Sequence, residues 1–97
     1  MRIIARPQLR DFGVRFPDAK GQLDAWWAEA SAARWTTPAE IKEKYRSASI
    51  LKGGRVVFNI CGNKYRLIVK FEYEKGLGFI RFIGTHKEYD QINAETV

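Results

Sequence analysis

The sequence is short, basic and moderately hydrophobic: 97 residues, a net charge of +6 and a hydrophobic fraction of 45%. A chain of this length folds around one core, so residues 1–97 are expected to form a single domain, and the hydrophobic content argues against disorder. No apolar run reaches the roughly 20 residues of a membrane span. The stretch 44–71 contains seven basic residues and no Asp or Glu. These features favour a polyanion, above all RNA, or an acidic protein as partner.

The single cysteine and the single histidine limit the covalent and metal chemistry of the chain. Cys61 has no partner for an internal disulfide, and His86 is the only imidazole that could enter a structural zinc site. The apolar stretch at the N-terminus is too short for a signal peptide. We therefore expect a soluble, cytoplasmic protein that binds no metal and needs no cofactor.

The first part of the chain predicts a short strand followed by helices. Arg2–Ala5 has β-type composition and ends at Pro7. Gln8–Phe16 is weakly helical. From Ala19 to about Arg34 the apolar residues, including two adjacent tryptophans, recur at the spacing of an amphipathic helix.

Two capping sequences predict further helix starts. Thr37-Pro38-Ala39-Glu40 combines a capping box with a proline in the first helical turn, and it predicts a short helix over Pro38–Tyr45. Thr85-His86-Lys87-Glu88 has the same spacing and predicts a last helix that ends near Asn93.

Between these helices the hydrophobic period changes to that of β-strands. Arg55–Ile60, Lys64–Tyr73 and Gly78–Ile83 are rich in β-branched and aromatic residues and are joined by tight-turn sequences. The predicted order is β-α-α-β-β-β-α. The fold class that follows is α+β, with a small antiparallel β-sheet and helices packed mainly on one of its faces.

Alternation along the strands sorts their side chains onto two faces. One face is apolar, with Phe58, Leu67, Ile80 and Phe82 among its residues, and we expect it to form the core. The opposite face is predicted to carry Arg55, Val57, Asn59, Lys64, Arg66, Ile68, Lys70, Glu72, Phe79, Arg81 and Ile83.

Two-residue turns would place three cations in a row across this second face. Arg55 would then face Lys70, Lys70 would face Arg81, and Arg66 would face Thr85. Like charges directly opposite destabilise a sheet by roughly 0.2–1 kcal/mol per pair, so such a row makes sense where a phosphate backbone binds. The alternative is an ordinary solvated strand face. The apolar residues among the cations could stack on bases or be covered by a partner chain.

The stretch Arg81–Asp90 brings proton-transfer groups to this surface. His86, Tyr89 and Asp90 share one side of the predicted last helix. A lone histidine at a helix start is more often an ordinary surface or capping residue. Here the predicted proximity of Arg66 and Arg81 favours a functional cluster.

Two segments closely resemble the HigB family of bacterial toxins. They are Gly62-Asn-Lys-Tyr-Arg-Leu-Ile-Val-Lys70 and Arg81-Phe-Ile-Gly-Thr-His-Lys-Glu-Tyr-Asp90. The Pro17-Asp18 helix start, Trp35-x-x-Pro38 and the stretch Ile50–Ile60 are also similar, so the resemblance extends over nearly the full chain. The family looks like a branch of the RelE-like ribonuclease toxins, which have a small antiparallel sheet flanked by helices.

The resemblance implies an mRNA interferase of a type II toxin–antitoxin system. It implies a metal-independent endoribonuclease that acts on messenger in the A site of the 70S ribosome and so inhibits translation and growth. Its products would be a 2′,3′-cyclic phosphate and a 5′-OH. It also implies a cognate HigA-like antitoxin with a helix-turn-helix domain, through which the complex would bind operator DNA.

The residues of the cluster fit the steps of metal-free RNA cleavage. Arg66 and Arg81 are assigned to the phosphate, His86 to proton transfer, and Tyr89 to acid or base-stacking duty. Further cations expected to bind RNA are Arg55, Lys64, Lys70 and Lys87.

Two other functions use the same features differently. A non-catalytic toxin module could bind RNA, the ribosome or another target through the basic face, as a RelE-like relative that poisons DNA gyrase indicates. A DNA-binding regulator is disfavoured because no helix-turn-helix pattern is visible in the sequence.

Overall fold

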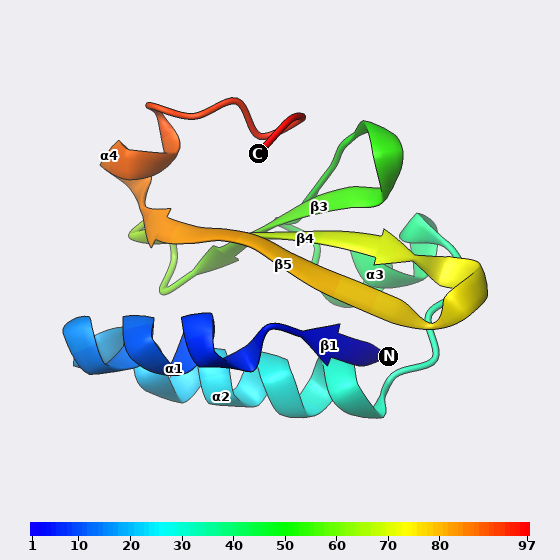
Figure 1. Ribbon diagram of the computed structural model, residues 1–97, viewed down its shortest axis with the longest axis horizontal. Coiled ribbons are helices and arrows are strands. Elements are labelled where there is room, and N and C mark those ends of the chain that lie inside the picture. The colour runs from blue at the N-terminus through cyan, green and yellow to red at the C-terminus, as the bar shows by residue number, and fades with distance from the viewer.

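The computed structural model of residues 1–97 is an α+β fold in which a five-stranded sheet has helices α1 and α2 on one side and α4 on the other (Figure 1). This confirms the predicted fold class. No helix is both long and apolar enough to cross a membrane. In chain order the elements are β1 (Arg2–Ile4), α1 (Arg6–Arg15), α2 (Pro17–Ala32), α3 (Pro38–Lys44), β2 (Ser49–Ile50), β3 (Arg55–Ile60), β4 (Tyr65–Glu72), β5 (Leu77–Thr85) and α4 (His86–Tyr89).

The sheet has the strand order β1-β5-β4-β3-β2. Strands β3, β4 and β5 form the predicted antiparallel meander, and β2, which was not predicted, pairs antiparallel with β3. Strand β1 lies parallel to β5, with Arg2 opposite Leu77. The sheet is therefore mixed. Strand β1 can pair in parallel because helices follow it in the chain, so that no tight hairpin joins it to its partner β5.

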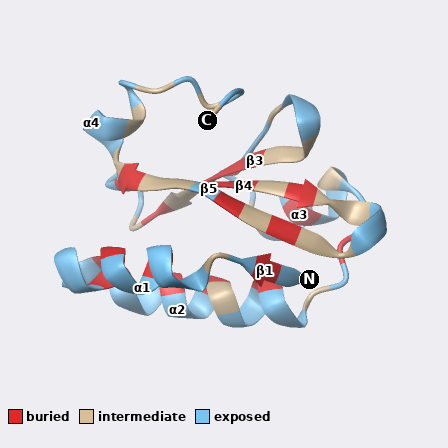
Figure 2. Cartoon of the chain, viewed as in Figure 1, coloured by how far each residue is buried: buried red, intermediate tan, exposed pale blue.

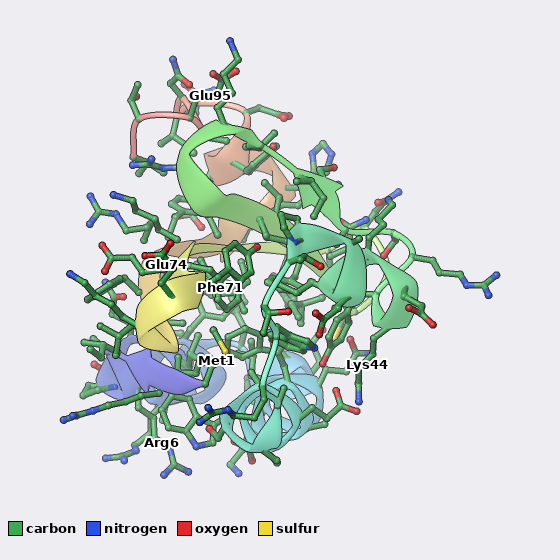
Figure 3. All side chains as sticks on the ribbon, turned by 90° about the vertical axis from the view of Figure 1, so that its right-hand side faces the viewer. Met1, Arg6, Lys44, Phe71, Glu74 and Glu95 are labelled. Atoms are coloured by element: carbon green, nitrogen blue, oxygen red, sulfur yellow. The ribbon has the colours of Figure 1, made fainter.

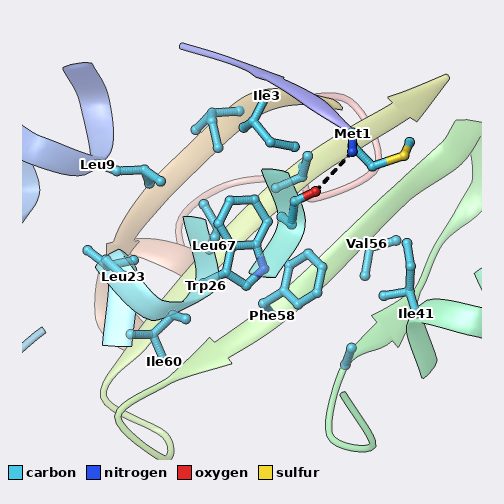
Figure 4. Close-up of a cluster of buried hydrophobic side chains, with 14 of the residues drawn as sticks. Met1, Ile3, Leu9, Leu23, Trp26, Ile41, Val56, Phe58, Ile60 and Leu67 are labelled. Carbon is cyan, nitrogen blue, oxygen red and sulfur yellow. Dashed lines mark hydrogen bonds between the residues drawn. The ribbon is translucent and has the colours of Figure 1, made fainter. Parts of the chain in front are cut away.

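The main core lies between the sheet and the helix pair α1–α2. Buried residues concentrate in the strands and on the sheet-facing sides of these helices (Figure 2). Trp26 of α2 packs edge-on against Phe58 of β3, with ring centroids 5.3 Å apart, and Leu67 of β4 is fully buried beside them (Figure 4). The amino group of Met1 donates to the carbonyl of Ala30 at 3.0 Å, so the end of α2 is tied to the start of β1.

Several helices begin or end at residues other than the predicted ones, mostly near prolines and capping residues. Helix α1 begins before Pro7, since proline is tolerated in a first turn, and α2 begins at Pro17, two residues earlier than expected. The Thr37 box does not form, because the Glu40 carboxylate accepts from the backbone and hydroxyl of Thr36. Helix α4 ends at Tyr89, earlier than predicted.

A β-bulge in β5 changes the predicted pairing of the strands. Arg55 faces Lys70, as expected. The register of β4 against β5 shifts between Ile68 and Val69, which pair with Phe82 and Ile80, so Arg81 is the extra residue. Lys70 therefore faces Phe79 and Arg66 faces Gly84, and the predicted pairings with Arg81 and Thr85 are wrong. The predicted row of three cations requires strict alternation along the strands, and one inserted residue in β5 breaks that alternation.

The bulge also exchanges the faces of two side chains. Phe82, predicted for the core, lies opposite Ile68, whereas Ile83 lies opposite Leu67 and packs against the core. A one-residue shift turns every later side chain of a strand to the other face. The ring of Phe82 then covers Gly84, where an added Cβ would lie 2.5 Å from the ring.

This crowding gives a test of the bulged register. Gly84→Ala should lower the free energy of unfolding by about 1–3 kcal/mol, because the methyl group displaces the Phe82 ring. The matched variant Gly21→Ala, at an exposed position of α2 with free space around it, should raise stability by about 0.4–1 kcal/mol. Urea unfolding of both variants measures the contrast. A Gly84→Ala protein as stable as the parent would contradict the position of the Phe82 ring over Gly84.

Candidate functional site

Apart from Lys64, the predicted site residues lie on the second face of the sheet or on α4, away from α1 and α2. Helix α4 and the chain after it run over this side (Figures 1 and 3), with Glu95 and Arg6 at opposite ends of the side view. Val57 and Ile68 of this face are buried, at 3% and 0% exposure, although they are not part of the main core cluster. The expectation that Ile68 offers a surface for base stacking is therefore wrong. It is packed under the chain's own side chains.

Arg66 is the most deeply placed charge of this face. Its side chain is only 9% exposed, yet no carboxylate contacts it. Its Nη1 donates to the carbonyl oxygens of Asn63 at 3.1 Å and Tyr65 at 3.2 Å, and its Nη2 donates to Asn63 Oδ1 at 3.2 Å. Neutral oxygens hold the guanidinium in place without neutralising it. A buried charge of this kind has a strong electrostatic preference for an anion.

Helix α4 is fixed at its start by a complete capping box. Glu88 N donates to Thr85 Oγ1 at 3.1 Å and Thr85 N donates to Glu88 Oε1 at 2.8 Å, as the sequence predicts. The backbone N–H of His86 also donates to the carbonyl of Lys64 at 2.9 Å. This last bond joins the helix to Lys64, the residue directly before β4.

The helix presents Tyr89 to Arg66 and carries His86 on its exposed side. The Arg66 guanidinium carbon lies 5.7 Å from the centre of the Tyr89 ring, and the same ring packs against Phe82 with centroids 6.4 Å apart. His86 Nδ1 lies 3.3 Å from Asp90 Oδ2 on the half-exposed side of the helix. Arg66 and Tyr89 are thus in contact at one end of the face, and His86 lies on the same short helix as Tyr89.

Arg81 lies in a second group of contacts on this face, together with Arg55 and Val97. Its Nε donates to the main-chain oxygen of Val97 at 3.1 Å, and Arg55 Nη2 donates to the same oxygen at 2.9 Å. Because Ile68 and the bulge are two residues from Arg66 along β4, the two groups are about 7 Å apart along the strand. Their guanidinium groups have different partners, since Arg66 is held by Asn63 and Tyr65 whereas Arg81 is held by Val97.

The remaining predicted RNA-binding residues have different surroundings. Lys70 is half-buried directly opposite Arg55, so that like charges adjoin. Lys87 is exposed on α4. Lys64 is engaged elsewhere, since its Nζ lies 3.0 Å from Asp18 Oδ2 at the start of α2.

Asp18 connects the helix layer to the strand that carries Arg66. Besides the Lys64 contact, it accepts a hydrogen bond from the Tyr65 hydroxyl at 2.6 Å. The bond from Tyr65, followed by that from Lys64, holds the pKa of Asp18 below its ordinary value. The same bond raises the pKa of Tyr65 to about 12.

Three residues of the site were not identified from the sequence. Asn63 has a recognisable place in a turn three residues before Arg66, but nothing in the sequence shows that both of its oxygens accept from that arginine. Phe82 is turned to this face by the bulge. Val97 is far from Arg55 in the chain, and no local pattern predicts their contact.

The residues of this face could support proton transfer next to guanidinium groups that can bind a phosphate. An imidazole held by a carboxylate can exchange protons, guanidinium groups can stabilise an oxyanion, and the Tyr89 phenol can donate a proton or stack on a base. None of the molecule's cavities is lined by Arg66, Arg81, His86 or Tyr89; one of 190 Å³ lies between α2 and β3. An open face of this kind suits a polymer better than a small molecule.

Comparison with known proteins gives consistent similarities. Residues 19–92 match the model of the HigB toxin family, described as the RelE-like toxic component of a toxin–antitoxin system. The chain is 29% identical over 96 residues to the mRNA interferase toxin HigB of Escherichia coli K12, an alignment that covers 97% of this chain and 92% of that protein. The mRNA interferases HigB of Escherichia coli O157:H7 and Shigella flexneri match with the same identity and coverage.

The Asp18 contacts predict a defined pH dependence of stability. Because the folded pKa is lowered, Asp18 stabilises the fold above its ordinary pKa of 3.8, and this contribution is lost as the pH falls through the folded value. Asp18→Asn should therefore lower the melting temperature at pH 7, and the gap to the parent should close as the pH falls through the folded pKa of Asp18. Thermal unfolding from pH 2 to 8 measures it, with Asp24→Asn, at an exposed Lys20 pair, as the control. A gap of equal size throughout that range would contradict the role of Asp18.

Proposed function

Because this chain belongs to the HigB family of RelE-like toxins, we propose that it is an mRNA interferase, as its relatives in Escherichia coli and Shigella flexneri are named. The proposed activity is metal-independent endoribonucleolytic cleavage of messenger in the ribosomal A site. The observation that carries the proposal is the Arg66 guanidinium, which is nearly buried, lacks a carboxylate partner and lies against Tyr89.

The proposed reaction is an attack by the 2′-OH of RNA on its own 3′-phosphodiester. A base removes the 2′-OH proton, the new 2′-O–P bond forms, and the bond to the 5′-oxygen breaks as that oxygen takes up a proton. The products are a 2′,3′-cyclic phosphate and a 5′-OH. His86, oriented by Asp90, serves in proton transfer, and Tyr89 either protonates the leaving oxygen or stacks on a base.

The charge that develops on the phosphorane needs donors that are already in place. Arg66 is held by the Asn63 and Tyr65 oxygens, so its orientation costs little reorganisation when the phosphate binds. Arg81 contributes from the bulge on the neighbouring strand. Arg55, Lys70 and Lys87 extend the positive surface along the path of the strand of RNA. Lys64 can join them by exchanging Asp18 for phosphate.

Cleavage by the purified protein tests the proposed roles. His86→Ala should lower the rate of cleavage of messenger on translating ribosomes by about 10²–10⁴-fold, the usual contribution of a positioned acid or base. Tyr89→Phe should cause a loss of similar size where the hydroxyl acts as the acid, and a small loss where the ring stacks. Mapping of new 5′ ends in the A-site codon gives the rates, and Arg10→Ala, an exposed cation on α1, is the control.

Two outcomes would contradict the proposal. Absence of new A-site cuts with the unmodified protein would exclude the activity. Growth arrest that persists in cells producing His86→Ala and Tyr89→Ala proteins would favour the alternative, a toxin that binds its target through the same face without cutting it.

Membership of the family means that an antitoxin partner neutralises this chain. We propose that it is a HigA-like protein with a helix-turn-helix domain, through which the complex binds operator DNA. Co-production of such a protein from the adjacent gene should restore growth. Purified complex should bind the operator in a gel-shift assay, whereas the isolated toxin should not. Specific duplex binding by the isolated toxin would contradict the proposal that the antitoxin provides the DNA-binding domain.

A further inference from the structure

Two guanidinium groups from different strands converge on one oxygen at the second face. Arg55 lies at the start of β3 and Arg81 in the bulge of β5, with β4 between them. Both donate to the main-chain oxygen of Val97, at 2.9 Å and 3.1 Å. The last residues of the chain turn back over the sheet to reach this position (Figure 1).

The acceptors at this position are too few for the cations around it. Lys70 lies directly opposite Arg55 in the sheet, so a third cation adjoins the two arginines that share this one oxygen. The Nε of Arg55 is buried and has no hydrogen-bond acceptor. Adjacent like charges and an orphaned buried donor both raise the energy of the fold. A phosphate would correct both, because it carries the opposite charge and offers several oxygens to the donors around it.

The segment that occupies the position is weakly attached. Within Asn93–Val97 the hydrogen bonds are local, from the N–H groups of Thr96 and Val97 to the carbonyl of Asn93 and from Glu95 N to the Asn93 side chain. The two bonds to Val97 are the only hydrogen bonds that join this segment to the strands. No residue after Tyr89 is buried. Segments with so few buried contacts open at little cost in free energy.

We propose that Arg55 and Arg81 form a binding site for a phosphate of the RNA strand next to the bond that is cut, and that the segment Asn93–Val97 fills this site until RNA displaces it. The inference rests on the proposed function for the identity of the anion. The Val97 oxygen stands in for a non-bridging phosphate oxygen. Arg81 then changes partner from the chain's own backbone to the substrate when RNA binds.

The test measures binding without cleavage. A short 2′-O-methyl RNA, which lacks the attacking hydroxyl, is titrated against the full chain and against a chain shortened to end at Glu95, with fluorescence anisotropy as the readout. The shortened chain should bind about three- to tenfold more tightly, because no hydrogen bonds to Val97 have to be broken first. Arg55→Ala should weaken binding and lower the slope of log affinity against log salt by about 0.7, the value for one phosphate contact on a single strand.

The decisive result is the coupling between the two changes. In the Arg55→Ala background, shortening the chain should have much less effect, since one of the two bonds that it releases is already absent. Asn93→Ala, which removes the side-chain acceptor of the turn while keeping the full length, is a second way to loosen the segment and should change affinity in the same direction. Thermal unfolding verifies that each variant is folded, and Arg10→Ala is again the control.

The outcomes separate this inference from the proposed function. Equal gains from shortening with and without Arg55, or no gain from either way of loosening the segment, would overturn the site and leave cleavage at Arg66 and His86 standing. Coupled gains in a protein that makes no A-site cuts would overturn the proposed activity and leave the phosphate site standing. Absence of RNA binding by every form would overturn both.

Discussion

The pairing of β4 with β5, interrupted by the one extra residue Arg81, is the constraint on which the rest of the structure depends. Before the bulge, β5 places Ile80 in the core; after it, Ile83 takes the core position opposite Leu67. A strand of strict alternation would have brought Phe82 to the core instead. Because of the bulge, residues before and after Arg81 in β5 both pack into the core, while Phe82 faces α4.

The position of α4 follows from this pairing. Its capping box begins at Thr85, directly opposite Tyr65, and Tyr89 packs on Phe82 and reaches Arg66. The same few residues therefore fix the helix and build the site. On the other side of β4, Tyr65 is held by Asp18, so the strand that carries Arg66 is secured from both layers of the fold.

The two faces of the sheet differ in the charged groups that they carry. The face towards α1 and α2 is an aromatic and aliphatic core. The second face contains a buried guanidinium without a carboxylate, a pair of cations directly opposite one another and an orphaned guanidinium donor. A fold selected for stability alone would avoid all three. Their concentration on one face is the physical reason for placing an anionic polymer there, because the phosphates of RNA would relieve each of them.

The sequence was sufficient for the features that local rules control. Period-two alternation identified strands β3 to β5, and the Thr85–Glu88 spacing identified the start of α4. Local rules could not locate the bulge, because it is defined by the register of β5 against β4, which places Ile80 and Ile83 but not Phe82 towards the core. They also could not foresee that the segment after Tyr89 returns to Arg55, or that Lys64 prefers Asp18. Each of these depends on contacts between residues far apart in the chain, for which a single sequence carries no pattern.

The central claim is that the face built by the bulge holds RNA by its phosphates, and a crystal structure of the protein with an uncleavable 2′-O-methyl RNA would test it most directly. The account predicts that oxygens of one phosphate lie about 2.7–2.9 Å from guanidinium nitrogens of Arg66, beside Tyr89 and His86, and that oxygens of the neighbouring phosphate lie at similar distances from Arg55 and Arg81. It also predicts that the Val97 oxygen has left Arg55. RNA bound along α1 and α2, or on the second face with its phosphates away from both Arg66 and Arg81, would contradict the account.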